Sequence, residues 1–284
     1  MVGKVDLVMW TKNGSRTLPF VLKRINQVIP SESVNSRLIV DDQSTDSSRE
    51  IAGSFGWRVI PNEGNGISNG ANTALKHVET AFFVSFEQDL LLARDWWQKV
   101  PRYLSDPKVA VASGIRFVNY PLSIKRIEEY SAENYRKSEK EELYSPYVKT
   151  LDNTIYRTDV IRRLGGFPVI PGSVGVDCAM SQRVFLGGYR WKVDYNVVSV
   201  HLRHGLKGEL AHNYWYGTCS DELERSMFQR NASARRMLLR FLFSPTRGLE
   251  IAVKKRAPEA IYIYPLMRLS YLRGVFDGRR RAVR

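Results

Sequence analysis

Residues 38–46, LIVDDQSTD, place two adjacent carboxylates directly after the apolar run of a buried β-strand. Asp41 and Asp42 therefore emerge at the carboxyl end of this strand, where a parallel sheet carries its ligand crevice. The polar residues 44–46 predict the cap of a following helix, because Ser, Thr and Asp are favoured immediately before helices. An acidic turn with an ordinary cap explains the stretch equally well, so the neighbouring strands decide its meaning.

Strands and helices alternate on both sides of this stretch. Apolar runs predict strands at residues 5–10, 57–60 and 81–86, and amphipathic patterns predict helices at residues 15–30 and 46–55. Residues 61–78 pass from a Gly/Asn loop into a further helix. This alternation predicts an α/β fold with a doubly wound, mostly parallel sheet and right-handed crossovers, rather than a sandwich or a bundle.

A second strand also ends in acids, because AFFVSF at residues 81–86 is followed by Glu87, Gln88 and Asp89. Carboxylates that share one sheet edge repel each other unless a cation lies between them. Mg²⁺ and Mn²⁺ bind carboxylate oxygens and keep coordination positions for phosphate oxygens. The sequence therefore predicts Mn²⁺ or Mg²⁺ with a phosphorylated ligand. The alternative is that Glu87 and Asp89 only cap the segment that follows.

Length and composition indicate a globular protein. With 284 residues, 43% of them hydrophobic, the chain can form one large α/β domain with an appendage, or two small domains. Cys178 and Cys219 lack metal-ligand spacing, so a zinc site and a disulfide framework are not expected. Residues 5–10 are too short for a signal peptide, and no run approaches the roughly 18 apolar residues of a membrane span. We expect a cytoplasmic protein.

The net charge of +14 is concentrated at one end of the chain. Residues 225–284 contain 15 Lys and Arg against three acids, whereas residues 1–224 contain 28 basic and 26 acidic residues. The sequence thus combines a balanced domain with a basic tail.

Five short motifs occur in a fixed order along the chain. They are VDDQSTD at 40–46, NEGNGISNGAN at 62–72, FEQD at 86–89, LGGF at 164–167 and GVDCAMSQRVFLGGYRW at 175–191. Each is weak alone, but in this order and spacing they resemble the family-2 inverting glycosyltransferases of GT-A fold, over roughly residues 4–204. The resemblance implies a Rossmann-like GT-A domain that moves a sugar from a nucleotide-sugar donor to a glycan or lipid-linked acceptor.

The resemblance also implies roles for individual residues. Asp41 and Asp42 would face the nucleoside, and the acids from Glu87 to Asp89 would hold Mn²⁺ or Mg²⁺ on the donor diphosphate. Glu87 replaces the usual Asp, so Asp89 is the safer ligand. The residues expected at the donor are Thr11, Asn13, Asp41, Asp42, Asn65, Gly66, Asn69, Gln88 and Arg203.

Two further residues complete the implied site. The family's Glu-Asp pair reads Val176-Asp177 here, so Asp177 is expected to be the general base that direct displacement at an anomeric carbon requires. The alternative is that Asp177 is the N-cap of its helix. His201, which ends a VVSV run, would be a third metal ligand, although strand alternation leaves His204 open as the ligand.

The resemblance ends near residue 216, so we expect a catalytic domain at 1–216 and a basic helical extension at 217–284. RRMLLRFLF, GLEIAVKKR and IYIYPLMRLSYLRGVF fit amphipathic helices that bind an anionic membrane surface, here the cytoplasmic face, and present a lipid-linked acceptor. A helical subdomain that packs its apolar face on the core is the alternative. Nucleic acid is compatible with the charge, but no nucleic-acid motif supports it.

Two other functions compete with glycosyl transfer. A nucleotidyltransferase also uses strand-end acids and a metal, but TKNGSR at residues 11–16 is a poor match to its Gly-rich basic loop. The departures at Val176 and Glu87 are compatible with a decayed transferase that only binds membrane or nucleic acid. Residues 116–150, rich in charge, are expected to form a loop that shapes the acceptor site.

Overall fold

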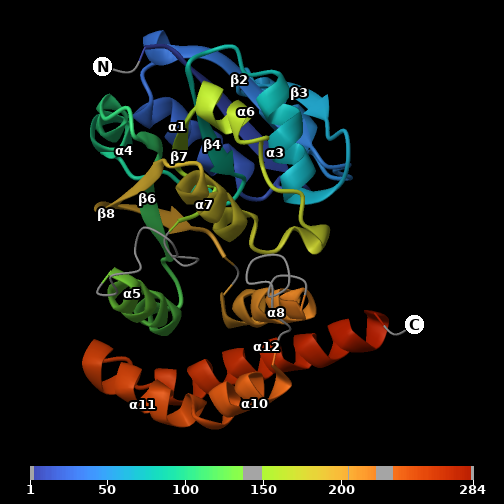
Figure 1. Ribbon diagram of the computed structural model, residues 1–284, viewed down its shortest axis with the longest axis vertical. Coiled ribbons are helices and arrows are strands. Elements are labelled where there is room, and N and C mark those ends of the chain that lie inside the picture. The colour runs from blue at the N-terminus through green and yellow to red at the C-terminus, as the bar shows by residue number, and fades with distance from the viewer. Residues whose placement is uncertain (1–2, 137–148, 204, 222–232, 283–284) are drawn as a thin grey trace. The chain divides into compact units, whose positions relative to one another are not determined.

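The computed structural model describes residues 3–136, 149–203, 205–221 and 233–282 (Figure 1). The chain forms two compact units. The first consists of Met1–Arg116, Glu139–Val169 and Gly175–Leu202, and the second of Phe117–Ser138, Ile170–Val174 and Arg203–Arg284, so far as these ranges are described. The predicted domain boundary between residues 216 and 217 stays a prediction.

The first unit is built from alternating strands and helices, and the second is helical. The strands and the helices around them are β1 (Val5–Thr11), α1 (Leu18–Val28), η1 (Ser31–Ser33), β2 (Val34–Asp41), α2 (Ser48–Ser54), β3 (Arg58–Pro61), α3 (Gly66–Lys76), β4 (Phe82–Glu87), β5 (Leu90–Leu91), α4 (Trp96–Lys99), η2 (Pro101–Ser105), β6 (Val109–Val118), β7 (Thr154–Arg157), α6 (Thr158–Arg163), α7 (Val176–Leu186) and β8 (Arg190–His201). The elements of the second unit are α5 (Leu122–Arg136), η3 (Pro171–Ser173), α8 (Gly205–Thr218), α10 (Ala234–Leu242), α11 (Ser244–Lys255) and α12 (Ala260–Ala282).

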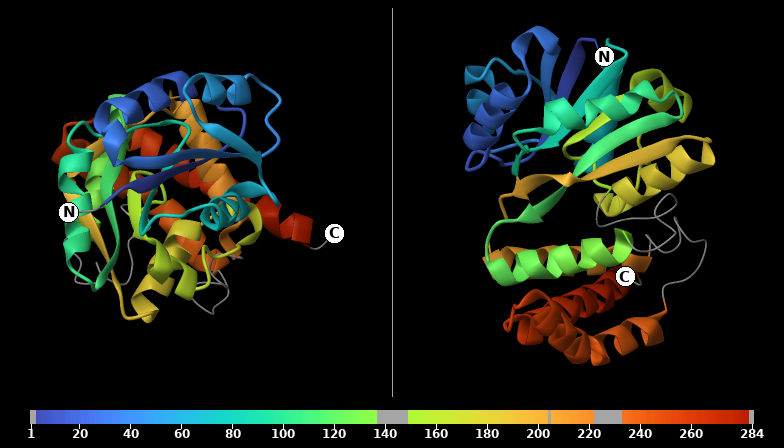
Figure 2. Two further views of the ribbon diagram at one scale, coloured as in Figure 1. Left: turned by 90° about the horizontal axis from the view of Figure 1, so that it is seen from above. Right: turned by 90° about the vertical axis from the view of Figure 1, so that its left-hand side faces the viewer.

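The strands form one mixed sheet in the order β3-β2-β1-β4-β7-β6-β8-β5, flanked by helices (Figure 2). Strands β3, β2, β1 and β4 are parallel neighbours. Strand β7 runs antiparallel to both β4 and β6, and β5 runs antiparallel to β8. The predicted α/β fold and the six elements predicted up to residue 60 and at 81–86 are confirmed, with ends that differ by a few residues.

The core of the first unit follows from its apolar patterns. All seven residues of β1 are buried, as expected for a central parallel strand that is covered on both faces. Helix α1 buries Leu18, Val21, Leu22 and Ile25, which recur at helical spacing along one face. Each such side chain stabilises the fold by roughly 1.5–3 kcal/mol relative to an exposed one. The burial fixes the sheet and so the positions of its strand ends.

The register of the sheet places the carboxyl ends of β1, β2 and β4 beside one another. Thr11 pairs with Asp41, and Trp10 pairs with Glu87, so β1, β2 and β4 end at the same level. Because parallel strands point the same way, their carboxyl ends share one edge of the sheet. The acids that follow β2 and β4 therefore emerge along this edge, as the sequence predicted.

In the second unit, helices α8 and α12 pack backbone to backbone. A Cβ atom on Gly217 would lie 2.1 Å from the carbonyl oxygen of Tyr271, and one on Gly274 would lie 2.1 Å from that of Tyr214. Only glycine permits this approach. Helix α5 packs against α11 and α12 through a separate apolar cluster that includes Ile127, Ile251 and Ile263.

Two expectations concern residues 116–150 and the basic tail. Residues 116–136 are not a loop, because they complete β6 and form helix α5, while residues 137–148 of that predicted loop lie outside the described residues. The predicted helical character of the basic tail is confirmed by α10, α11 and α12. Across the described chain, no helix has both the length and the apolar character needed to cross a bilayer.

Candidate active site

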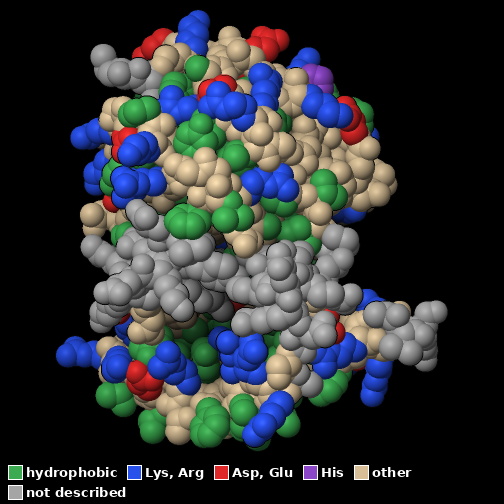
Figure 3. Space-filling model, viewed as in Figure 1, with side chains coloured by type: hydrophobic (Ala, Val, Ile, Leu, Met, Phe, Trp, Pro, Cys, Tyr) green, Lys and Arg blue, Asp and Glu red, His purple; other side chains and the backbone are tan. Residues whose placement is uncertain are grey.

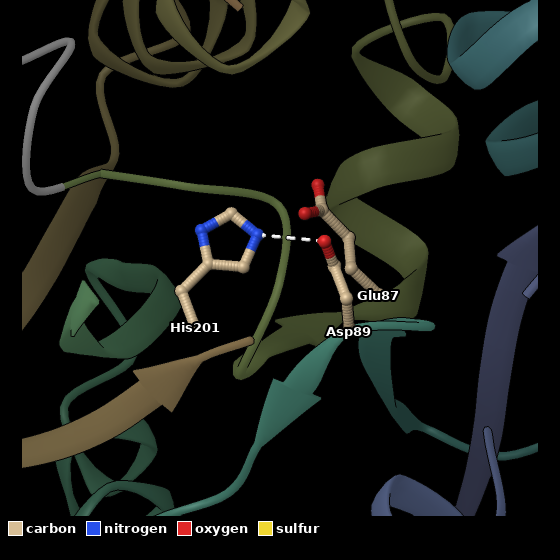
Figure 4. A group of neighbouring side chains, drawn as sticks. All are labelled: Glu87, Asp89 and His201. Atoms are coloured by element: carbon tan, nitrogen blue, oxygen red, sulfur yellow. Dashed lines mark hydrogen bonds and ion pairs between the residues drawn. The ribbon is translucent and has the colours of Figure 1, made fainter. Parts of the chain in front are cut away.

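Glu87, Asp89 and His201 bring their side chains together at the carboxyl edge of the sheet. One ligand atom from each lies within 4.8 Å of the other two. Nε2 of His201 is 3.0 Å from Oδ2 of Asp89, and Figure 4 shows the imidazole facing the two carboxylates. The His201 side chain is only 5% exposed, whereas that of Asp89 is 31% exposed. The group is thus anchored on one side and open on the other.

A long-range strand pairing creates this group. Leu90, in the short strand β5, pairs antiparallel with His201, the last residue of β8. The backbone N–H of Leu202 donates to the carbonyl oxygen of Asp89 at 2.7 Å. These contacts hold the end of β8 against the turn that follows β4, and the imidazole lies beside the carboxylates as a result.

The donor set suits a hard or borderline divalent cation. Two carboxylates and one imidazole match the ligands of Mn²⁺, and the carboxylates match Mg²⁺. The longer side chain of Glu87 still brings a carboxylate oxygen into the group, so a Glu in place of the usual Asp leaves a carboxylate at this position. His204, the alternative to His201, lies outside the described residues.

Arg116 and Asp152 extend the group inward, and sequence reasoning missed both as site residues. Nη1 of Arg116 lies 2.8 Å from Nδ1 of His201, and its Nε forms an ion pair with the carboxylate of Asp152. Asp152 is fully buried and also accepts hydrogen bonds from Thr150 and, at 2.9 Å, from Nδ2 of Asn153. A chain of contacts therefore runs from Asp89 through His201 and Arg116 to Asp152.

One of these residues carried a signal in the sequence. Arg116 interrupts the largely apolar stretch of residues 109–118, and a cation within a buried strand requires a partner. Asp152 carried no such signal in the sequence, because an Asp between Leu151 and Asn153 is typical of any turn. Its burial becomes visible only once residues 154–157 are known to be a central strand.

Asp41 and Asp42 lie at the end of β2, with different partners. Asp41 accepts hydrogen bonds from the backbone N–H of Ser44 at 3.1 Å and from Nε of Arg49 at 2.7 Å. It is 3% exposed and helps to fix the turn into α2. Asp42 faces Lys12, whose Nζ lies 3.3 Å from Oδ2.

The segment 65–69 meets Asp42 at the start of helix α3. The backbone N–H of Gly66 lies 3.3 Å from Oδ2 of Asp42, and Gly66 has φ 75°, which favours glycine. Asn69 donates from Nδ2 to the carbonyl oxygen of Asn65 at 2.9 Å. A helix N-terminus at a strand edge favours a negatively charged group, such as phosphate.

The loop after β1 is hydrogen-bonded to the segments that follow β2 and β4. Gln88 accepts from the hydroxyl of Thr11 at 2.5 Å and from the backbone N–H of Lys12 at 2.8 Å. Asn13 accepts from the backbone N–H of Thr45 at 2.8 Å. Thr11, Asn13 and Gln88 thus hold the edge together, and their predicted contact with a donor stays a prediction.

Asp177 lies in the first turn of α7. The N-cap of this helix is Gly175, with φ 77°, so Asp177 is not the N-cap. Desolvation by burial raises the pKa of Asp177 to about 6, against the backbone N–H of Cys178 and the charge of Arg116, which both lower it. Asp152 also raises the pKa, so Asp177 shares an electrostatic environment with Arg116 and Asp152, the inner end of the chain of contacts that begins at Asp89.

Arg203 is not brought into this group by the described contacts. It belongs to the second unit, where Nη1 donates to Oε2 of Glu209 at 2.6 Å and Nη2 lies 3.2 Å from Nε2 of His212. Its side chain is only 13% exposed. Its predicted role at the donor stays a prediction.

Solved structures share this fold. The mannosyltransferase PcManGT from Pyrobaculum calidifontis, in complex with GDP-Man and Mn²⁺, has a TM-score of 0.64 at 19% identity, with 100% of this chain and 76% of that chain covered. Glucosyl-3-phosphoglycerate synthase from Mycobacterium tuberculosis, with Mn²⁺, UDP-Glc and phosphoglyceric acid, has a TM-score of 0.63 at 16% identity, with 82% of each chain covered. TarS 1-349 of S. aureus, with UDP-GlcNAc, has a TM-score of 0.53 at 14% identity, with 98% and 92% covered.

Sequence comparison identifies the family. No curated protein matches the chain significantly. The family model described as Glycosyl transferase family 2 matches residues 6–165, which is more than half of the chain. The strands that carry Asp41, Asp42, Glu87 and Asp89 lie within the matched residues, and the similar structures share the GT-A fold. The chain therefore belongs to glycosyl transferase family 2 and is a glycosyltransferase of GT-A fold that uses a nucleotide-sugar donor.

Proposed function

We propose that this chain is a metal-dependent, inverting hexosyltransferase that acts on the hydroxyl of a glycan or a lipid-linked acceptor. The observation that carries the proposal is the group of Glu87, Asp89 and His201 at the carboxyl edge of a GT-A sheet. Similar structures contain GDP-Man, UDP-Glc or UDP-GlcNAc, which supports a hexose donor as a class.

Glu87, Asp89 and His201 would hold Mn²⁺ or Mg²⁺. A divalent cation there would neutralise negative charge on the diphosphate as the bond to the sugar breaks. The residues themselves supply two anionic ligands and one neutral ligand, and the burial of His201 limits how far that ligand can move. Two of the similar structures contain Mn²⁺, which supports this choice of metal.

The strand-end residues next to this group would bind the nucleotide. Oδ2 of Asp42 already accepts from Lys12 and Gly66, and a ribose hydroxyl can donate to the same carboxylate. Thr11, Asn13, Asn65, Asn69 and Gln88 would line the same edge, with the N-terminus of α3 favouring the negative diphosphate.

Asp177 would be the general base. Its carboxylate accepts the proton of the acceptor hydroxyl while the hydroxyl oxygen attacks the anomeric carbon, and the bond from that carbon to the diphosphate oxygen breaks. A pKa of about 6 keeps the group ionised at neutral pH, yet makes it more basic than an ordinary aspartate. The sugar is transferred with inversion, and the nucleoside diphosphate is released.

Product analysis tests the proposal. The purified protein is incubated with Mn²⁺ and a panel of UDP-, GDP- and dTDP-hexoses, with water or an added glycan as acceptor. Glycosyl transfer releases a nucleoside diphosphate, whereas a nucleotidyltransferase would release pyrophosphate. Release of pyrophosphate would overturn the proposal, as would unchanged release of nucleoside diphosphate by the Asp89→Asn variant.

A further inference from the structure

Exposed apolar side chains concentrate on three helices of the second unit. Within the described residues, seventeen large hydrophobic side chains are strongly exposed, and eleven of them lie between residues 238 and 276. Single exposed apolar residues are ordinary on protein surfaces, but a concentrated set marks an interaction surface. Helices α10, α11 and α12, which carry this set, pack against one another.

Helix α12 shows that these side chains form a face. Tyr262, Leu266, Leu269 and Phe276 follow at intervals of four, three and seven residues, so they project from one side of the helix. Buried residues such as Ile263 and Met267 occupy another side of the helix. This helix is therefore apolar on the face that packs inward and also on the face that no described element covers.

The two preceding helices add to this surface. In α10 and just after it, Leu238 and Leu242 are one helical turn apart, and so are Leu239 and Phe243. Leu242 is 58% exposed and Phe243 is 66% exposed. Leu249 and Val253, at 52% and 72%, are one turn apart on α11. We call the eleven exposed hydrophobic residues between 238 and 276 the apolar face.

Cations accompany the apolar face. Residues 234–282 contain twelve Lys and Arg but only Glu250, Glu259 and Asp277 as acids. Arg247 and Lys254 both pair with Glu250, and the acids are too few to balance the rest. In the space-filling view, hydrophobic side chains gather over α10 and α11 with Lys and Arg side chains beside them (Figure 3).

We propose that the apolar face docks on an anionic lipid bilayer, with α10, α11 and α12 lying in the membrane interface. Leu, Phe and Tyr side chains enter the acyl boundary while Lys and Arg contact lipid phosphates, the combination that interfacial helices use. A second copy of the chain would bring two basic surfaces into contact, which repel each other. Nucleic acid would satisfy the cations but would leave the leucines in water.

The experiment uses flotation of the full chain with vesicles of phosphatidylcholine alone or with 30% phosphatidylglycerol. We expect at least tenfold tighter binding to the anionic vesicles and weakening by added NaCl, because surface charge attraction is screened by salt. Equal binding to both vesicles, or no binding to either, would overturn the proposal.

Matched variants assign the binding to the apolar face. The double variant Leu242→Ser/Phe243→Ser should bind anionic vesicles about tenfold more weakly, because it removes two inserting side chains. The control Phe20→Ser changes a residue of α1 that is 63% exposed, and it should bind like the wild type. Thermal unfolding at the wild-type temperature shows that the double variant is folded.

Two further results would overturn the proposal, by giving the apolar face another occupant or by placing vesicle binding elsewhere on the chain. One is a lipid-free dimer in sedimentation that Leu242→Ser/Phe243→Ser dissociates. The other is vesicle binding that survives Leu242→Ser/Phe243→Ser unchanged. Neither outcome depends on catalysis, so the proposal stands or falls separately from the proposed function.

Discussion

Arg116 donates from Nη1 to Nδ1 of His201, 2.8 Å away, and this contact selects the tautomer of a neutral imidazole. A guanidinium has donors only, so Nδ1 must be the acceptor and a neutral ring carries its proton on Nε2. Nε2 is the nitrogen that faces Asp89. A metal ligand at Nε2 needs the other tautomer, in which Nδ1–H would point at the guanidinium.

Arg116 is therefore expected to oppose metal binding in the absence of donor. The paired variant Arg116→Gln/Asp152→Asn removes the cation without leaving a buried carboxylate unpaired. We expect Mn²⁺ to bind it about threefold to tenfold more tightly than the wild type, measured by calorimetry, because the guanidinium no longer faces the Nδ1–H that a metal ligand at Nε2 requires. Arg49→Gln, which removes the cation paired with Asp41, is the control and should leave the affinity unchanged. Weaker Mn²⁺ binding by the paired variant would instead make Arg116 a residue that orients His201.

The Arg116–Asp152 ion pair should behave as a coupled unit in folding. Arg116→Gln alone leaves the fully buried Asp152 without its cation and should lower the free energy of unfolding by about 3 kcal/mol. Adding Asp152→Asn should restore at least half of this loss. Urea denaturation of the two single variants and the double variant measures the coupling. Strictly additive losses would show that the two residues do not interact energetically.

The raised pKa of Asp177 predicts how catalysis depends on pH. A base must be ionised, so kcat/KM should rise with pH through the pKa of about 6 and level off above it. Asp177→Asn should lower kcat by about a thousandfold while donor affinity is retained. Asp159→Asn, in the first turn of α6, is the control. A full transfer rate in Asp177→Asn would remove Asp177 as the base.

The ionised carboxyl of Asp177 should also lower the free energy of unfolding near neutral pH. Because its pKa is raised in the folded protein, the folded chain binds more protons than the unfolded chain between about pH 4 and pH 6. The free energy of unfolding contributed by this group therefore falls as pH rises through that window. At pH 7 we expect Asp177→Asn to be more stable than the wild type by up to about 2 kcal/mol, a bound set below the full shift because the side chain is partly open to solvent. Below pH 4 the two should converge in denaturant melts, and a difference that persists there would have another cause.

The sequence was sufficient to predict the parallel half of the fold and its acids. Strands β1, β2 and β4 each contain an apolar run, at residues 7–10, 38–40 and 82–84, and the elements around them follow one another locally. Once these strands are parallel neighbours, Asp41 and Glu87 must emerge at the same edge. Local patterns and one rule of sheet geometry are enough for that inference.

The rest depended on pairings between distant residues. His201 reaches Asp89 because β8 pairs with β5 across more than a hundred residues, and no local pattern encodes that register. The burial of Asp152 depends on β7 lying between β4 and β6, antiparallel to both. The resemblance suggested His201, but the contacts that hold it required the three-dimensional structure.

Calorimetry of nucleotide-sugar binding tests the central claim most directly. A panel of UDP-, GDP- and dTDP-hexoses is titrated into the wild type and into Asp89→Asn, each with Mn²⁺ and with EDTA. We predict that the wild type binds one donor at least tenfold more tightly with Mn²⁺, and that Asp89→Asn loses this difference. Donor binding by the wild type that is equally tight in EDTA, or a full Mn²⁺ effect in Asp89→Asn, would contradict the metal site assigned to Glu87, Asp89 and His201.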